Sequence, residues 1–599
     1  MRVENFSKFI KYFGQGRRIK LFGFFILSII AGSLELLGIA LVYPFILLLL
    51  KPEYIVNSSY YKDFAKFLFI PNTLTGAFII GLIVAILFIL KNLFIIYANF
   101  CQNKFISNWK IDIANRFMKY YLFAPYKKTL ETSPSEKIYK LTYLIGQSLD
   151  GFIFRIINLC TNSVIVVMIL GLLVWKFPSA AILTGIFITI TMIIHNKLFK
   201  ERTTKVSKDF ALQSLKNNEK MLEIINNIKE LKILSAEEHF FEEFHNLQKS
   251  FNNTMLLNNF YCSISPYIIE IFIVLSLIIL AAFIGFQNIE NTSWMVASYA
   301  VMVAAIFRIA PALNRIQTSL NAINGSREIV KTMLKEFENT DMSILEQSSG
   351  SKIEFIQKIQ LKNINFAYKK NPILKEINLE IKKGEFVGIV GLSGAGKSTL
   401  VDILMGLLPA DSGDFLIDET KITQSNMNSA RKIFGYVPQQ INIVDGSILR
   451  NIAFGEKESE INKEKVVKIL KETKIYDVIE NDEQRLYSDI IRGMTGLSQG
   501  QKQRLAIARA LYRDPEVLIL DEATSSLDVQ TENEITEVLN GFKGKKTIIA
   551  IAHRLSTLKS CDRLIYMKNG QIIDTGSFGE LSEKYSDFAK LVKLSSLEK

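Results

Sequence analysis

The first half of the chain contains long apolar runs, and these constrain its fold more than any other feature. The run from Leu21 to Leu50 is almost continuously apolar, and about 20 such residues let a helix cross a hydrocarbon core of about 30 Å. Hydrophobic residues make up 49% of the 599 residues, which is typical of a membrane protein when they are gathered into spans. We therefore predict a polytopic helical membrane domain with six spans: Leu21–Leu50, Ala77–Tyr97, Phe152–Val174, Ala180–Ile194, Tyr267–Phe286 and Trp294–Ala312.

The distribution of positive charge predicts how these spans are oriented. The formal net charge is +13, but much of the excess lies beside the spans, where basic residues mark the cytoplasmic side. The segments Asn99–Asp150 and Asn196–Cys262 are long and lysine-rich with helical periodicity. We place both of them, the N-terminus and the second half of the chain in the cytoplasm, with the spans in the cytoplasmic (inner) membrane. This explanation of the charge also argues against a nucleic-acid partner.

Several ionisable residues fall inside or beside the spans, where they are costly and indicate function by default. Glu35, Glu270 and Arg308 are best explained by an interior cavity. For Lys91 and Arg315, snorkelling near a span end is an equally good explanation. The outer loop has its own pattern, because apolar and basic residues between Tyr60 and Leu68 fit either an amphipathic helix on the membrane or a packed surface helix.

The second half of the chain has a glycine-rich segment after an apolar run. Residues 391–399 read GLSGAGKST, the spacing of a phosphate-binding loop, although one such match alone can arise by chance. Glycines let successive N–H groups face phosphate oxygens, and the following helix offers its positive N-terminal end. Lys397 would reach the β and γ phosphates of ATP, and Ser398 would bind Mg²⁺. The candidate ATP ligands in this segment are Gly391, Ser393, Gly394, Gly396, Lys397, Ser398 and Thr399.

Two further motifs of a nucleotide site lie downstream of the phosphate-binding loop. Residues 517–522 read VLILDE, an apolar strand that ends in two carboxylates. Asp521 would reach the Mg²⁺ site, and Glu522 would polarise an attacking water. Upstream of this strand, residues 497–501 read LSQGQ and begin a long basic helix. Alternating strand and helix patterns around these motifs predict an α/β domain with a largely parallel sheet.

With these motifs in this order, and with SSLD at 525–528 and AHRL at 552–555, the chain resembles the ATP-binding cassette (ABC) family. The resemblance implies that Tyr368 stacks on adenine, with an ordinary strand aromatic as the alternative. It implies that Gln439 touches Mg²⁺ and the water, that Asp528 communicates across a dimer, and that His553 contacts the γ-phosphate. It also implies that the signature residues Ser498, Gly500 and Gln501 face the ATP held by a second subunit.

The resemblance covers the whole chain and implies an exporter half-transporter of type I, with six transmembrane helices fused to an α/β P-loop ATPase domain. The boundaries that we expect are 1–325 for the membrane domain, 326–351 for a linker and 352–599 for the nucleotide-binding domain. Because every site residue is present in one chain, a homodimer would have two competent sites. Short cytoplasmic helices should dock on these domains, and Thr132–Leu141 and Asn226–Glu237 are the candidates.

Among exporters, the chain is most similar to flippases of lipid-linked oligosaccharides of the PglK type. The residues that carry this similarity are Ser33, Glu35, the run LVYPF at 41–45 and the run FRIAPALNRIQTS at 307–319. It implies a polyprenyl-diphosphate glycan as substrate and a cavity with cations suited to phosphate. The substrate-cavity candidates are Glu35, Lys91, Arg308 and Arg315. A general lipid A or multidrug exporter is the alternative.

Overall fold

The computed structural model describes residues 3–14, 16–50, 74–176, 178–287, 292–339, 352–369, 371–476, 489–490, 497–522, 528–551 and 554–589. The predicted outer-loop segment Tyr60–Leu68 and His553 lie outside these residues. The chain forms two compact units. The membrane unit comprises Met1–Ala124 and Glu131–Leu345, and the cassette unit comprises Pro125–Leu130 and Glu346–Lys599.

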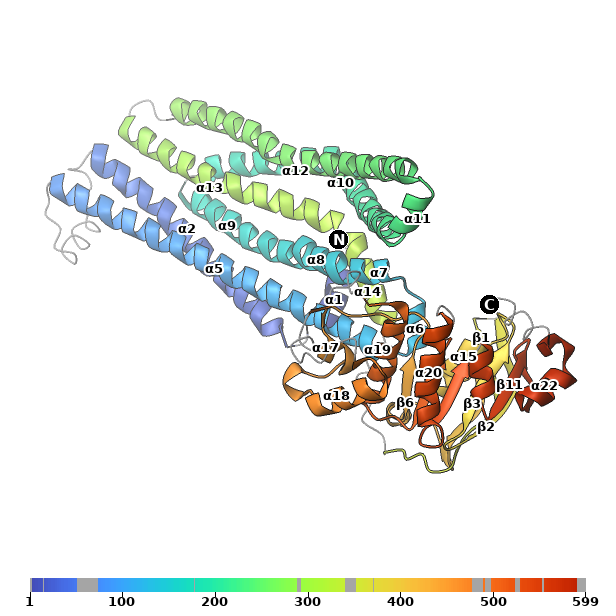
Figure 1. Cartoon of the computed structure of the whole chain (residues 1–599). Helices are drawn as coiled ribbons and strands as arrows, with labels where there is room; N and C mark the ends of the chain where they lie inside the picture. The colour runs from blue at the N-terminus through green and yellow to red at the C-terminus, as the bar shows by residue number, and fades with distance from the viewer. Residues whose placement is uncertain are drawn as a thin grey trace. The chain divides into compact units, whose positions relative to one another are not determined.

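The membrane unit is a bundle of long helices (Figure 1). Within the described residues, five helical stretches are long and apolar enough to cross a membrane: Arg18–Ala40, Gly81–Phe123, Pro134–Trp175, Glu237–Ile279 and Tyr299–Gly325. The predicted span Ala180–Ile194 lies in a further long helix, α10. The bounds of the long helices are α2 (Arg18–Leu50), α5 (Leu74–Phe123), α9 (Phe154–Lys176), α10 (Pro178–Asn226), α12 (Glu237–Gln287) and α13 (Thr292–Gly325).

The two polar segments that we expected to connect the spans on the inside are largely continuations of the helices. α5 runs to Phe123, and α10 and α12 meet at a short hairpin around α11 (Ile228–Ile233). No proline or glycine interrupts residues 99–123 or 196–226, and either residue would have weakened or ended a helix there. Of the two predicted docking segments, Asn226–Glu237 contains α11, whereas Thr132–Leu141 covers α7 (Pro134–Tyr139) in the membrane unit.

The short helix that belongs to the cassette unit is instead α6 (Tyr126–Leu130). Lys127 of α6 lies 3.5 Å from an oxygen of Asp411 and 5.0 Å from the ring centre of Phe366. The predicted first docking segment, Thr132–Leu141, therefore lies just after α6 and does not overlap it. Pro125 and Pro134 mark the starts of α6 and α7, because proline favours the first turn of a helix and disfavours its interior.

Around its N-terminal helix the membrane unit has a core of its own. α1 (Val3–Phe13) packs its buried Phe9 and Phe13 near Trp109, whose Nε1 donates to the carbonyl of Phe13 at 2.9 Å. α14 (Arg327–Asn339) joins this core through Val330 and Met333. The predicted linker therefore begins as a packed helix. Between α7 and α9 the helix contains two π-helical turns, η1 (Lys140–Leu144) and η2 (Leu149–Ile153), on either side of α8 (Ile145–Ser148).

Besides a two-stranded sheet of β7 (Gly446–Ser447) and β8 (Asp489–Ile490), the cassette unit has two main sheets. The larger has the strand order β12-β11-β3-β10-β9-β6, with all neighbours parallel except β12 and β11. Its strands are β3 (Phe386–Gly391), β6 (Phe434–Val437), β9 (Val517–Asp521), β10 (Thr547–Ile551), β11 (Arg563–Lys568) and β12 (Gln571–Gly576). The smaller, antiparallel sheet has the order β2-β1-β4-β5, formed by β1 (Lys358–Tyr368), β2 (Asn371–Lys382), β4 (Ser412–Ile417) and β5 (Thr420–Lys421).

Helices follow the strands of the larger sheet. They include α15 (Lys397–Leu404) after β3, α19 (Gln499–Tyr512) before β9, α20 (Val529–Phe542) between β9 and β10, and α21 (Leu555–Ser560) after β10. Others are α16 (Met427–Arg431), α17 (Ile448–Ile452), α18 (Lys463–Glu472) and α22 (Phe578–Lys584). Since the carboxyl ends of parallel strands meet at one sheet edge, the segments after β3, β9 and β10 are brought together there.

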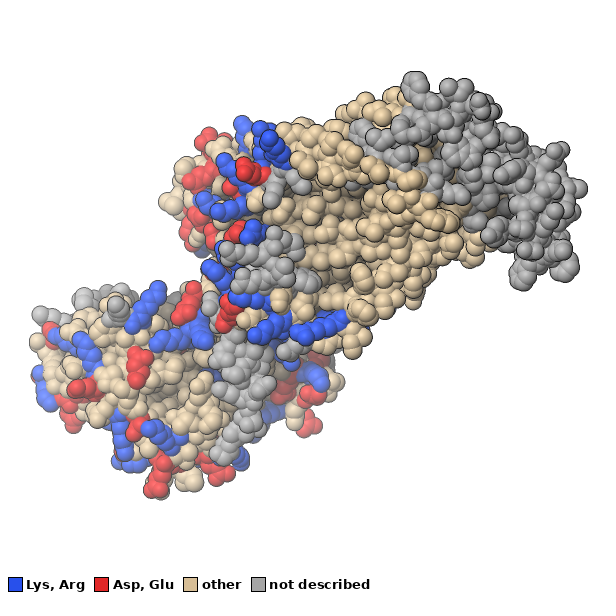
Figure 2. Space-filling model, turned by 180° about the vertical axis from the view of Figure 1, so that it is seen from behind, with Lys and Arg blue, Asp and Glu red and all other residues tan. Residues whose placement is uncertain are grey.

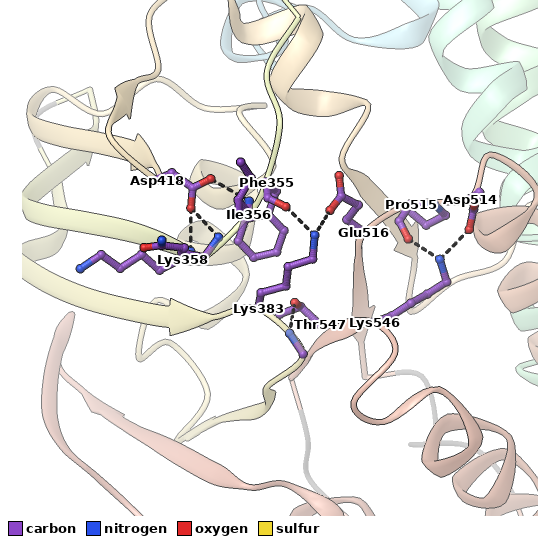
Figure 3. Close-up of polar contacts among 12 residues, drawn as sticks. Phe355, Ile356, Lys358, Lys383, Asp418, Asp514, Pro515, Glu516, Lys546 and Thr547 are labelled. Atoms are coloured by element: carbon purple, nitrogen blue, oxygen red, sulfur yellow. Dashed lines mark hydrogen bonds and ion pairs between the residues drawn. The ribbon is translucent and has the colours of Figure 1, made fainter.

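The opposite edge of the cassette unit is fastened by charged side chains (Figure 3). The carboxylate of Asp418 accepts three backbone N–H groups, from residues 356, 357 and 358, at 2.7 to 2.8 Å. Lys383 Nζ donates to the carbonyl of Phe355 and to the carboxylate of Glu516, both at 2.6 Å. The Asp418 bonds join the entry of β1 to the turn between β4 and β5, and the Lys383 bonds join it to the turn before β3 and to the start of β9.

Candidate active site

The phosphate loop is shaped by three glycines with positive φ angles. β3 is buried along its whole length and ends at Gly391, where an added Cβ would lie 2.3 Å from the carbonyl oxygen of Met567. Gly394 (φ 80°) and Gly396 (φ 96°) occupy the left-handed region that favours glycine. Gly396 also precedes α15, and a Cβ there would lie 2.8 Å from Leu374 Cδ2. The loop therefore presents backbone N–H groups at the start of α15.

The side chain of Lys397 is bonded to the backbone of the phosphate loop. Its Nζ donates to the carbonyls of Gly391 at 2.8 Å and Leu392 at 3.1 Å. Burial lowers the pKa of Lys397, and the negative charges of Glu522 and Asp521 oppose that shift. Burial, with a contribution from the charge of Asp521, also raises the pKa of Asp402 to about 6. Charges of both signs therefore gather beside the phosphate loop.

The two carboxylates at the end of β9 have different partners. Asp521 Oδ2 accepts a hydrogen bond from the Tyr436 hydroxyl at 3.1 Å, and Glu522 Oε2 accepts one from Gln439 Nε2 at 2.6 Å. Glu522 has a positive φ of 48°, and its N–H donates to the carbonyl of Ile551 at 3.2 Å. The strained turn directs the second carboxylate differently from the first. Sequence reasoning missed Tyr436, because an aromatic on a short strand carries no distinctive signal.

The donor set at this edge fits Mg²⁺ bound together with nucleotide phosphates. Ser398 lies in the first turn of α15 with an exposed side chain, and Asp521 and Gln439 add a carboxylate and an amide. Mg²⁺ prefers oxygen ligands and is commonly held by one or two carboxylates with substrate phosphates and water. Within the described residues there is no cluster of three His, Cys, Asp or Glu side chains that could hold a metal by itself. The arrangement matches a metal that arrives with its nucleotide.

Tyr368 lies at the end of β1, next to the contact made by α6. Its ring meets that of Phe366 edge to face at 4.9 Å between ring centres, and burial raises its pKa. Asp411, the partner of Lys127, also accepts the backbone N–H of Ala367 at 2.7 Å. The helix α6 therefore reaches the strand end that carries Tyr368.

The signature segment begins α19 with a reciprocal cap. The N–H of Gln501 donates to Ser498 Oγ at 3.3 Å, and the N–H of Ser498 donates to Gln501 Oε1 at 2.8 Å. Ser498 is exposed and Gly500 is buried. Both capping bonds stay within the turn, and the Ser498 side chain at the start of α19 is exposed. The positive N-terminal end of this helix can therefore be approached by an anion.

A threonine on α20 connects Asp528 to the signature. Asp528 caps α20 by accepting the N–H and the hydroxyl of Thr531, each at 2.8 Å. These bonds lower the pKa of Asp528. The methyl carbon of Thr531 lies 2.1 Å from the position of a Cβ built on Gly500. No sequence motif indicated Thr531.

A second residue of α20 holds the segment that follows His553. Glu532 is 6% exposed, and its carboxylate accepts from Arg554 at 3.3 Å and from the hydroxyl of Ser556. Arg509 on α19 donates to the backbone carbonyls of Asn451 at 2.7 Å and Asn442 at 2.9 Å. These side chains position the segments after β10 and after Gln439.

In the membrane unit, three of the four predicted cavity residues form one cluster. Lys91 Nζ lies 2.9 Å from Glu35 Oε2, and Arg308 Nη1 lies 3.4 Å from Glu35 Oε1. Lys91 is 3% exposed and Glu35 is 7% exposed, so the snorkelling alternative for Lys91 is wrong. Both cations also lie over the ring of Phe88, at 4.5 Å for Lys91 Nζ and 5.8 Å for Arg308 Cζ.

The remaining candidates lie elsewhere. Arg315 is two helical turns beyond Arg308 on α13, and its side chain is exposed. Glu270 is exposed on α12. Neither forms a salt bridge with a described residue. Gly38 was missed, although a Cβ there would lie 3.2 Å from Phe88 and 3.9 Å from Lys91 Nζ. Because Gly38 has no side chain, Phe88 and Lys91 can pack close to its backbone.

The hairpin around α11 exposes apolar side chains at its tip. Ile228, Ile233 and Leu234 are 56%, 71% and 73% exposed. A pocket of about 380 Å³ lies beside them, lined mainly by apolar side chains of α10, α11 and α12. An apolar tip on an otherwise charged hairpin is typical of a docking surface.

Two family models match this chain. The model described as ABC transporter transmembrane region matches residues 22–310, and the model described as ABC transporter matches residues 374–525. A solved structure entitled "Structure of a bacterial Atm1-family ABC exporter with ATP bound" superposes with a TM-score of 0.77 at 19% identity, over 96% of this chain and 98% of that one. The predicted fold class, a helical membrane domain fused to an α/β P-loop domain, is thereby confirmed.

Curated relatives with two kinds of name are similar to this chain. The ATP-dependent lipid A-core flippase 1 of Colwellia psychrerythraea is 28% identical over 531 residues, which is 85% of this chain and 86% of that protein. A protein named ATP-dependent lipid A-core flippase from Francisella tularensis is 27% identical over 77% of this chain and 75% of its own length. The ABC multidrug transporter atrD of Emericella nidulans is 38% identical, but over only 42% of this chain and 19% of its own.

Proposed function

Because the chain belongs to the ABC transporter family as an exporter half-transporter, we propose that two copies form an ATP-driven flippase for a lipid-linked oligosaccharide. The substrate would be a polyprenyl-diphosphate glycan, moved across the cytoplasmic membrane. The observation that carries this proposal is the buried cluster of Glu35, Lys91 and Arg308. ATP hydrolysis as such is a general property of the family.

The cassette residues have separate tasks in the ATP step. The phosphate loop and Lys397 hold the β and γ phosphates, and Tyr368 stacks on the adenine. Ser398, Asp521 and Gln439 would hold Mg²⁺, which would supply positive charge against the phosphates. Glu522 accepts a proton from the attacking water, and its bond to Gln439 at 2.6 Å places it beside a residue that contacts the same site. His553 completes the γ-phosphate contacts.

We infer a homodimer because one chain cannot bring its own signature residues to its own ATP. Ser498 and Gly500 lie at the outward end of α19, which is suited to an anion held by another molecule. The exposed apolar tip of the α11 hairpin would be covered by the cassette of the second copy. ATP then binds the closed pair more tightly than the open one, and this difference in affinity drives the change in the membrane halves.

The membrane cluster suits an anionic group. Two cations face one carboxylate, so the cluster has an excess of one positive charge. The side chain of Arg308 is 37% exposed, whereas that of Lys91 is 3% exposed. Glu35 and Lys91 would therefore orient Arg308, whose planar guanidinium suits a diphosphate.

A lipid A or drug exporter is the second candidate, and the names of the two groups of relatives favour it. A phosphorylated lipid without a polyprenyl tail would also use the excess positive charge. A neutral drug would not need it. A loss of activity on Arg308 substitution would therefore indicate a charged lipid and not a neutral drug. Whether lipid A or the polyprenyl lipid is flipped then distinguishes the two flippase functions.

The test uses the full chain in proteoliposomes. We expect a polyprenyl-diphosphate oligosaccharide to stimulate ATP turnover and to be flipped. Arg308→Ala should reduce both by about tenfold, the loss of one charge-assisted contact of about 1.4 kcal/mol, and Arg315→Ala should have a smaller effect. The matched control is Arg202→Ala, an exposed arginine on α10. Flipping of lipid A but not of the polyprenyl lipid would replace the proposal with the lipid A alternative. Stimulation by neutral drugs that is insensitive to Arg308 would replace it with the drug-exporter alternative.

A further inference from the structure

A groove of about 930 Å³ opens between α2 and α5 in the membrane unit. Its walls combine three cations with aromatic and aliphatic side chains. The cationic wall is formed by Arg17, Lys20 and Lys104, and the only carboxylate in the lining is Asp112. The groove is separate from the Glu35 cluster and from the nucleotide site, because it shares no lining residue with either.

The charges of the groove are not balanced. Arg17 pairs with Asp112 and also lies over the rings of Phe105 and Trp109, at 5.8 and 5.4 Å. Lys20 and Lys104 are exposed, and neither pairs with a carboxylate in the part of the chain that the structure describes. The lining therefore has two positive charges in excess, on two side chains that are free to reach an anion.

The floor of the groove is apolar and has room. Phe24 and Phe105 are each 8% exposed, with their ring centres 5.1 Å apart. Gly23 lies between this floor and Lys20, and a Cβ added to Gly23 would meet no atom within 4 Å. The groove therefore accepts a group that is charged at one end and apolar at the other.

The groove lies where both helices change from apolar to charged. The apolar span of α2 begins next to Lys20, and the apolar part of α5 ends shortly before Lys104. Ile19, Phe22 and Phe100 nearby are 86%, 64% and 61% exposed, as lipid-facing side chains are. Figure 2 shows the same pattern on one face of the molecule, where Lys and Arg gather at the edge of a broad uncharged surface. This boundary is the depth of the lipid headgroups on the cytoplasmic side.

We propose that this groove binds the headgroup of an anionic phospholipid from the cytoplasmic leaflet. Lys20 and Lys104 contact the phosphate, and the acyl chains lie against Phe24, Phe105 and the exposed apolar surface beside them. Basic side chains near the membrane attract anionic lipids with a strength that falls off within a Debye length. A bound lipid would fasten the junction of α1 and α2 to α5. Lipid binding in this groove would not depend on which substrate is transported.

The test counts lipids bound to the full chain. The protein is extracted from nanodiscs of phosphatidylcholine containing about a tenth phosphatidylglycerol, and native mass spectrometry measures the affinity for each lipid. We expect the wild type to prefer phosphatidylglycerol. Lys20→Ala with Lys104→Ala should weaken that preference by about tenfold or more. Lys197→Ala, which changes an exposed lysine just after the predicted span Ala180–Ile194 in α10, should not. Gly23→Leu fills the groove without changing charge and should also weaken binding.

Three results would overturn the proposal. The double lysine variant could keep the wild-type preference, or Lys197→Ala could weaken it equally, which would indicate a diffuse basic surface. Inorganic pyrophosphate could displace the bound lipid, which would indicate a site for soluble phosphates. Thermal unfolding of each variant, compared with the wild type, separates loss of binding from loss of fold.

Discussion

The methyl group of Thr531 occupies the place where a side chain on Gly500 would begin, with its carbon 2.1 Å from a Cβ built on that glycine. The hydroxyl of the same Thr531 is bonded to Asp528 at 2.8 Å. One side chain of α20 therefore contacts both the signature turn and the residue expected to communicate across the dimer. The packing of Thr531 therefore requires a glycine at position 500.

Gly500→Ala should destabilise the cassette by about 1–3 kcal/mol, the usual cost of forcing an extra methyl into a packed site. Thr531→Ser removes the methyl and keeps the hydroxyl that bonds Asp528. The double variant should therefore recover most of the loss in apparent unfolding temperature, measured by differential scanning fluorimetry. If the double variant were as unstable as Gly500→Ala, Thr531 would not be the clashing group.

Glu522→Gln should lower the rate of ATP hydrolysis by a factor of about 10² or more, because a general base contributes at least that much. Nucleotide binding should persist, since the amide keeps the shape of the carboxylate. Glu516→Gln is the matched control, because Glu516 lies just before the other end of the same strand and pairs with Lys383 at 2.6 Å. Turnover near the wild-type rate in Glu522→Gln would remove the assignment of the base.

Glu35→Gln should destabilise the membrane unit strongly, because it leaves Lys91 buried without a carboxylate. Removing one partner of a buried ion pair typically costs about 3–5 kcal/mol, whereas replacing both partners can be nearly neutral. Glu35→Gln with Lys91→Met should therefore unfold at a higher temperature than Glu35→Gln alone. Equal or additive losses in the double variant would show that the two side chains do not stabilise each other.

Asp418 should stabilise the cassette at neutral pH, and this stabilisation should be lost at acidic pH. Burial disfavours its ionisation, but three backbone N–H groups outweigh that effect and lower its pKa below the ordinary value, which is about 3.9 in unfolded chains. A lowered folded-state pKa contributes stability that is complete above the unfolded value and lost as pH falls through the folded one. Asp418→Asn should lower the unfolding temperature by a constant amount between pH 8 and pH 5, and by less below about pH 4. A difference that shrinks already between pH 7 and pH 5 would contradict this.

The broad architecture could be predicted because its signals are local in sequence. Apolar runs of span length and the phosphate-loop spacing do not depend on distant residues. The position of the first docking helix was missed because two short helices lie close together, α6 directly after Pro125 and α7 beginning at Pro134. Only the packing of Lys127 against Asp411 and Phe366 distinguishes them.

The supporting residues of the site could not be predicted for a related reason. Thr531, Glu532 and Tyr436 act through neighbours distant in sequence or on another element, so no spacing pattern reveals them. Within the membrane, the charges of Glu35 and Lys91 were visible but their pairing across 56 positions was not. A single sequence shows that such residues are costly, and the structure shows what each one is bonded to.

The central claim, that each ATP is enclosed by the phosphate loop of one copy and the signature of the other, is tested most directly with mixed pairs. Differently tagged chains, all carrying Glu522→Gln, are co-expressed, and mixed pairs are purified by both tags. A pair of Lys397→Ala with Ser498→Glu has one intact composite site and should occlude one ATP. A pair in which one chain carries both changes and the other carries neither has none, and should occlude no ATP. The reverse result, occlusion only in the second pair, would show that each chain encloses its own nucleotide and would contradict the account.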